Sequence, residues 1–159
     1  MTEEGVILTY GVTKSLAPVD ATAYPKVMVT MEQAAGMAML LPEVVEGTKW
    51  GQRTWLIDGK GFAWERPLSK ADIKRYGPTA PPEGPIIAIA AEDLGEREAI
   101  LAANRPGFFT ISHFDGYPAF LIQLDIVDRG HLEEALVDGW LCCAPPRLAD
   151  EFLKRQRPT

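Results

Sequence analysis

The sequence contains few residues that could cross-link the chain or hold a metal. Its only two cysteines, Cys142 and Cys143, are adjacent, so they cannot bridge distant segments, and they lack the paired spacing of a zinc site. Neither of its two histidines belongs to a His-x-x-x-His or mixed Cys/His pattern, and no Gly-Lys-Ser/Thr sequence is present. We therefore expect no disulfide framework, no metal, no cofactor and no nucleotide-binding P-loop.

Long apolar runs are also missing. No run approaches the roughly 20 residues needed to cross a bilayer. The chain starts with an acidic Met-Thr-Glu-Glu sequence and not with the basic start of a signal peptide. We expect a cytoplasmic protein that has no membrane partner. Its 159 residues, of which 47% are apolar, are enough for one domain with a full hydrophobic core.

Positive charge is scarce and unevenly placed. The formal net charge of −6 opposes binding to a phosphate backbone, because such affinity comes mainly from Lys and Arg. Residues 49 to 75 nevertheless carry seven Lys or Arg against three Asp or Glu, and residues 83 to 151 have the opposite sign. A local basic face is therefore compatible with the sequence, although a solvated surface also explains such runs.

Helix signals occur in both halves of the chain. Thr30 and Gln33 have the spacing of a capping box, and the apolar residues that follow keep helical spacing until Pro42. One helical turn is expected over residues 70 to 76. Further helices are expected between Asp93 and Pro106, between Asp128 and Pro145, and over residues 147 to 156.

Strand signals come mainly as hairpins. Asp58-Gly59 separates two runs with a period of two, at residues 54 to 57 and 60 to 64, which is a strong hairpin signal. Residues 86 to 90 are expected to form a third strand. Residues 108 to 111 and 117 to 124 are expected to form a second hairpin around Asp115-Gly116. This order predicts an α+β fold, an antiparallel sheet of about five strands packed with helices. Residues 1 to 27 show no sustained period and are expected to be a loosely structured extension of the single domain 28 to 159.

Candidates for catalysis are few. His113 and Asp115 could form an acid–base pair, but side-chain hydrogen bonds to the turn backbone are the commoner arrangement for such neighbours. His131 is expected to be a solvated helix residue. Cys143 falls on an apolar helix stripe, which favours packing over a redox role. We expect no catalytic residue.

The first hairpin interleaves basic and aromatic side chains. Alternation along a strand places Arg53 and Trp55 on one face, and it places Lys60, Phe62 and Trp64 together on one face. The pattern is typical either of a surface on which bases stack while cations bind phosphates or of a Trp-rich sheet core edged by solvated Lys and Arg. Exposure of that face decides between the two.

Several motifs in the same order resemble the MmcQ/YjbR family. They are Leu41 to Gly51, Asp58 to Ala63, Arg105 to Phe109, Ser112 to Pro118 and Ala144 to Ala149. The resemblance runs from about residue 30 to residue 155. It implies a compact α+β fold similar to that of the bacterial frataxin homologue CyaY, and a DNA-binding role.

Two hypotheses follow. In the first, the protein is a non-catalytic DNA-binding or regulatory protein whose phosphate contacts are Lys49, Arg53, Lys60, Arg66 and His113. In the second, it is a protein- or small-ligand-binding domain with no nucleic-acid role, and its pocket is bounded by Trp50, Trp64, His113 and Tyr117. An enzyme ranks third, because it would need His113 and an acidic neighbour in one cleft. The sequence does not indicate an oligomeric state.

Overall fold

The computed structural model describes residues 28 to 156, and the extension predicted for residues 1 to 27 lies outside this part of the chain. The fold is α+β, as expected, with an antiparallel sheet of six strands in the order β2-β3-β4-β5-β7-β6. The strands are β2 (Val45–Lys49), β3 (Gln52–Ile57), β4 (Lys60–Glu65), β5 (Ile86–Ala90), β6 (Phe108–Phe109) and β7 (Ala119–Gln123). The helices are α1 (Met31–Met39), α2 (Lys70–Arg75), α3 (Leu94–Ala102), α4 (Arg129–Cys143) and α5 (Pro146–Gln156), with a 3₁₀ turn η1 (Ser112–Phe114). Within residues 28 to 156 no helix is long and apolar enough to cross a membrane.

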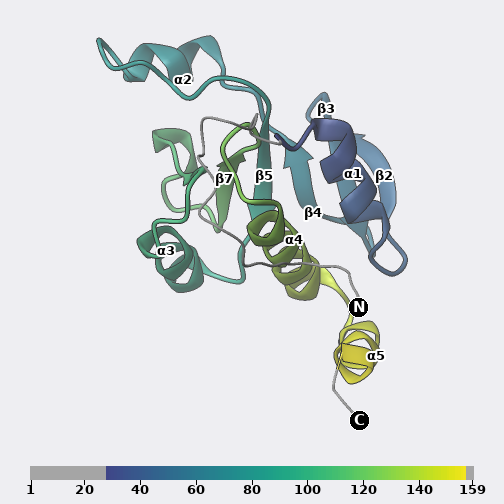
Figure 1. The fold of residues 1–159 in the computed structure, drawn as a ribbon. Helices are drawn as coiled ribbons and strands as arrows, with labels where there is room; N and C mark the ends of the chain where they lie inside the picture. Colours follow the sequence, from purple (N-terminus) through teal and green to yellow (C-terminus); the bar gives the residue numbers. More distant parts are fainter. Residues whose placement is uncertain (1–27, 157–159) are drawn as a thin grey trace, which may run out of the picture.

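Helices cover one face of the sheet. Helix α4 packs on β4 and β5, and α1 packs on α4 and β3, so both lie in front of the sheet in Figure 1. The main core lies between these layers and includes the fully buried side chains of Trp55, Phe62, Ile89 and Trp140. We call this the helix face of the sheet, and the opposite side the open face.

The helices begin where the capping signals predicted. Thr30 and Gln33 form the reciprocal capping box of α1, and the Asp93 side chain accepts a hydrogen bond from the Glu96 backbone N–H at the start of α3. The expected helical turn at residues 70 to 76 is α2, which has its own capping box from Ser69 and Asp72. Helix α2 stands apart on the long connection between β4 and β5 (Figure 1).

Two tight hairpins join β2, β3 and β4. The predicted hairpin at Asp58-Gly59 is confirmed. Both turn residues have positive φ (52° and 75°), as a type I′ turn requires. A second turn of this kind, Trp50-Gly51 with φ of 51° and 75°, joins β2 to β3 and was not predicted. Strand β2 was missed with it, because a central glycine and exposed charges hide its alternation.

A β-bulge in β4 corrects the predicted faces of the first hairpin. Trp55 pairs with Ala63 and Leu56 with Gly61, so Phe62 is the extra residue of the bulge. Phe62 therefore packs in the helix-face core, and Trp64 packs in a second cluster on the open face. The expectation that Phe62 and Trp64 share a face was wrong, because strict alternation fails at a bulge.

The second predicted hairpin is shorter and less direct than expected. Strands β6 and β7 do pair antiparallel, but η1 and a further turn lie between them. Asp115 (φ −58°, ψ 126°) and Gly116 (φ 77°) form a type II turn closed by a 2.9 Å hydrogen bond from the Tyr117 N–H to the Phe114 carbonyl. Asp115-Gly116 thus shapes a loop and does not join the two strands directly.

Candidate functional site

The open face of the sheet carries its own small apolar cluster. Trp64, Ile86, Ala88 and Leu121 supply it from β4, β5 and β7, and Phe114 of η1 packs against them. Helices α1 and α4 lie on the other face, so of the part of the chain that the structure describes, loops and the short α2 cover this cluster. Partial cover of an apolar surface is the setting in which ligand pockets form.

A pocket of about 730 Å³ lies at this cluster, and we call it the Trp64 pocket. Its aromatic and apolar walls are Trp50, Trp64, Pro67, Leu68, Ala71, Phe114 and Tyr117. Its polar walls are Gln52, Arg66, Ser69, Asp72, Arg75 and His113. The volume falls within the range of about 300–1,000 Å³ that is usual for small-molecule sites.

The four residues of the predicted ligand pocket, Trp50, Trp64, His113 and Tyr117, all line this pocket. Their rings are not packed into one solid cluster. Trp64 and Tyr117 meet edge to face with centroids 6.4 Å apart, and Trp64 is buried, whereas Tyr117 is half exposed. Trp50 is 80% exposed at the pocket rim. Aromatic faces are therefore available to a molecule in the pocket.

A buried carboxylate organises the charged wall. Asp72 is only 2% exposed; its Oδ2 accepts hydrogen bonds from the Ser69 backbone N–H (2.9 Å) and lies 3.0 Å from Arg66 Nη1. Arg75 Nη1 lies 3.5 Å from the other oxygen. Burial acts to raise the pKa of Asp72, but hydrogen bonds from Ser69 and Arg66 outweigh it and hold that pKa below its usual value. Asp72 therefore stays ionised and fixes Arg66 at the wall.

Arg97 of α3 holds the loop that forms the far wall. This side chain is 8% exposed, and its Nη1 donates to the carbonyl of Phe114 at 2.6 Å and to that of Tyr117 at 3.0 Å. Glu98 balances its charge through a 2.8 Å contact. Arg97 thus ties the two ends of the type II turn, and with them two aromatic walls of the pocket, to α3.

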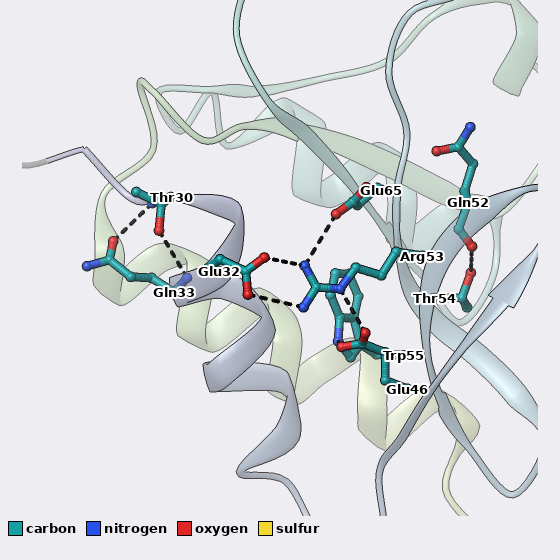
Figure 2. A network of polar contacts seen from close by, with 9 residues as sticks. All are labelled: Thr30, Glu32, Gln33, Glu46, Gln52, Arg53, Thr54, Trp55 and Glu65. Carbon is teal, nitrogen blue, oxygen red and sulfur yellow. Dashed lines mark hydrogen bonds and ion pairs between the residues drawn. The ribbon is translucent and has the colours of Figure 1, made fainter.

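Arg53, one of the predicted phosphate contacts, lies on the helix face in a network of carboxylates (Figure 2). Its guanidinium contacts Glu32 of α1 at 2.7 Å, Glu46 of β2 at 2.9 Å and Glu65 of β4 at 3.6 Å. Hydrogen bonds with Glu32 and Glu46 raise the pKa of Arg53. The hydrogen bond between Arg53 and Glu32 also lowers the pKa of Glu32. Arg53 therefore links α1 to three strands, with its charge already compensated.

The other four predicted phosphate contacts divide between two places. Lys49 and Lys60 lie near the hairpin ends, where Lys49 Nζ is 3.4 Å from the Gly59 carbonyl oxygen. Arg66 and His113 both line the Trp64 pocket. The five residues are thus spread over three locations, and among them only Arg66 and His113 line the Trp64 pocket.

The residues considered for catalysis do not gather at one point. His113 lines the Trp64 pocket, whereas Asp115 lines a neighbouring hollow beside α2 that shares Asp72 and Arg75 with that pocket. Asp72 does share the pocket with His113, but its carboxylate already binds Ser69 and Arg66. His131 is half buried and less solvated than expected, and its Nδ1 has no hydrogen-bond partner among residues 28 to 156.

The cysteines form no metal or redox centre in the described residues. Cys143 packs against the helix-face core, as its place on the apolar stripe predicted. Cys142 is exposed near Glu96. Across residues 28 to 156, no group of three His, Cys, Asp or Glu side chains is arranged to hold a metal ion.

Sequence reasoning missed Asp72, Arg75 and Arg97. The first two were read as part of a charged run, and only the Ser69-x-x-Asp72 spacing carried a signal, that of a capping box. Arg97 had no signal at all, because an arginine on a short polar helix normally points to solvent. Its role depends on contacts 17 and 20 residues away along the chain.

Comparison with known proteins gives relatives but no assigned role. An uncharacterized protein of Mycobacterium bovis and two of Mycobacterium tuberculosis are each 36% identical to this chain over 129 residues. The matches cover 79% of this chain and 97% of each relative. No protein-family model and no solved structure matches. The chain belongs to the same family as these mycobacterial proteins.

Proposed function

We propose that this protein is a non-catalytic binding protein that holds a small, largely apolar ligand in the Trp64 pocket. The observation that carries this proposal is the convergence of Trp50, Trp64, His113 and Tyr117 on one pocket. These residues come from the β2–β3 turn, from β4 and from the β6–β7 connection. Only the fold brings them together, around a volume that suits a small molecule.

The walls also have the composition of a ligand site. Aromatic and aliphatic side chains stand beside polar ones, Asp72 holds Arg66 in place, and Arg97 fixes the loop that carries Phe114 and Tyr117. Fixed polar groups on an apolar wall give a ligand orientation and specificity. A pre-formed wall also lowers the entropic cost of binding.

The test uses N-phenyl-1-naphthylamine, an uncharged aromatic probe that fluoresces in apolar sites. Ala71 is exposed on α2 and lines the pocket, so Ala71→Phe places a ring in the pocket without touching the core. Ile73→Phe on the same helix is the matched control, because Ile73 is exposed but is not among the lining residues. We expect Ala71→Phe to weaken probe binding about tenfold or more and Ile73→Phe to leave it unchanged.

Thermal unfolding and circular dichroism of both variants would show that each is folded. The proposal fails if neither this probe nor an anionic probe of the same scaffold gives fluorescence that Ala71→Phe removes. Binding elsewhere, for example at the apolar groove between α1 and α4, would persist in Ala71→Phe and is thereby separated from pocket binding.

DNA binding is the second candidate, favoured by the exposed Trp50 ring beside Lys49. A single-stranded base could stack on that ring while Lys49 and Lys60 meet phosphates. The test is anisotropy of labelled duplex and single-stranded DNA at about 50 and about 200 mM salt, comparing wild type with Lys49→Glu/Lys60→Glu. Salt-sensitive binding that the reversal abolishes would support this role, and absence of binding at the lower salt would end it.

The resemblance to the MmcQ/YjbR family belongs to this proposal as well. It is supported by the α+β class of the fold, which has an antiparallel sheet packed with helices. An experimental structure superimposed on CyaY would test it. A cytoplasmic location is proposed too, and cell fractionation would test that.

A further inference from the structure

Trp50 occupies a backbone position that suits a tryptophan poorly. It is the first residue of a type I′ turn, with φ of 51°, where Asn, Asp or Gly is normally found. A bulky residue with positive φ is strained. The ring offsets little of this strain by burial, because it is 80% exposed. Neither the turn nor the core explains the residue, so a role at the pocket rim is the better explanation.

The charged wall of the pocket carries a surplus of positive charge. Its charged residues are Arg66, Asp72 and Arg75, and one carboxylate cannot neutralise two guanidinium groups. Arg66 is committed, because it contacts Asp72 at 3.0 Å, donates to the Pro67 carbonyl at 2.6 Å and lies over the Phe114 ring. Within residues 28 to 156, the one ion pair of Arg75 is its 3.5 Å contact with Asp72, and its side chain is 52% exposed. Arg75 is therefore the cation that is free to receive an anion.

We propose that the ligand is an aromatic anion, with its ring system against Trp50, Trp64 and Tyr117 and its carboxylate, sulfonate or phosphate at Arg75. This inference rests on the proposed function and adds the chemical class of the ligand. An apolar pocket with one uncompensated cation favours a molecule that has one apolar part and one negative charge.

The experiment compares two probes that differ in one group. 8-Anilino-1-naphthalenesulfonate has the scaffold of N-phenyl-1-naphthylamine plus a sulfonate, so the difference between their affinities reports the anion site. Both are titrated against wild type, Arg75→Gln, Trp50→Gly and Ala71→Phe, and only fluorescence that Ala71→Phe removes is counted. Glycine at position 50 keeps the turn, because it tolerates positive φ.

Arg75→Gln should weaken the sulfonate probe roughly three- to fivefold at low salt, the range for a half-exposed ion pair, and leave the uncharged probe unchanged. Trp50→Gly should weaken both probes about fivefold or more through loss of stacking. The control Lys74→Gln, on the same helix but outside the pocket lining, should change neither.

The possible outcomes separate the two proposals. Equal affinity of both probes in wild type, or equal loss of both in Arg75→Gln, overturns the ligand class and leaves the binding function standing. Loss of both probes in Trp50→Gly with selective loss of the sulfonate probe in Arg75→Gln supports the class. Absence of pocket-dependent fluorescence from either probe overturns the proposed function itself.

Discussion

Replacement of Arg97 by methionine should loosen the far wall of the pocket. Methionine fills a similar space but donates no hydrogen bond, so the carbonyls of Phe114 and Tyr117 lose a charged donor. Each carbonyl keeps one backbone partner, from Tyr117 N–H at 2.9 Å and from Ala119 N–H at 2.8 Å respectively. Neither is therefore left fully unsatisfied, which keeps the expected cost moderate.

Hydrogen bonds to charged groups contribute about 1.5–3 kcal/mol each, and the remaining partners reduce the loss here. We expect the free energy of unfolding to fall by about 1–3 kcal/mol. With a urea slope of about 1–3 kcal/mol per M, a loss of 2 kcal/mol moves the unfolding midpoint by roughly 1 M. Loss of the loop anchor should also weaken binding of the naphthylamine probes, since Phe114 and Tyr117 line the pocket.

Arg105→Met is the matched control. Arg105 makes an ion pair with Glu134 at 2.6 Å, in which the Arg105 side chain is 35% exposed and the Glu134 side chain 57% exposed. Such pairs contribute about 0.2–1 kcal/mol, so the control should lose little stability and bind the probes normally. Urea unfolding of the two variants, followed by far-UV circular dichroism, makes the comparison. If Arg97→Met is no less stable than Arg105→Met and binds the probes equally well, Arg97 does not anchor the loop.

Three further predictions concern other parts of the fold. Gly139→Ala should lower the free energy of unfolding by about 1–3 kcal/mol, because the added Cβ would lie 2.7 Å from the Ile89 side chain. Gly36→Ala, where nothing lies near the added Cβ, should raise the free energy of unfolding by about 0.4–1 kcal/mol. Urea titration measures both changes. Folding lowers the pKa of Asp72, so the ionised carboxylate stabilises the fold at pH values above its unfolded pKa of about 3.9, and this stabilisation is lost as the pH falls through the folded pKa. Between pH 7 and pH 3 the wild type should therefore lose more stability than Asp72→Asn. Although the Cys142 residue is exposed, partial burial of its thiol and the carboxylate of Glu96 raise the pKa of that thiol to about 12. The thiol should therefore react with iodoacetamide at pH 8 far more slowly than a free cysteine, and fast labelling in the folded state would refute this.

Local signals predicted the elements that depend on neighbouring residues. The capping box of Thr30 and Gln33 and the Asp58-Gly59 turn were confirmed because each is specified within four residues. Strand β2 lacks such a signal, since its alternation is masked by Gly47 and by exposed charges. The bulge at Phe62 has none either, because it depends on how β3 and β4 pair.

The candidate site was partly predictable for the same reason. The aromatic residues Trp50, Trp64 and Tyr117 stood out by type, and the fold places them at one pocket. Their charged partners did not stand out. Arg53 looked equal to Arg66 in the sequence, yet three carboxylates surround the first and a pocket lies beside the second. Which cation remains available depends on long-range contacts that composition does not contain.

The open-face site depends on three departures from regular structure. The bulge at Phe62 turns Trp64 toward the open face, the strained turn presents Trp50 at the rim, and α2 carries a buried carboxylate, Asp72, against that face. The positive φ of Trp50 costs stability on its own, and each of the three features contributes a wall to the same pocket. The helix face, by contrast, is packed with apolar side chains. Departures from regular structure that converge on one place are expected where a protein binds its ligand, and this convergence supports the ligand site proposed for the Trp64 pocket.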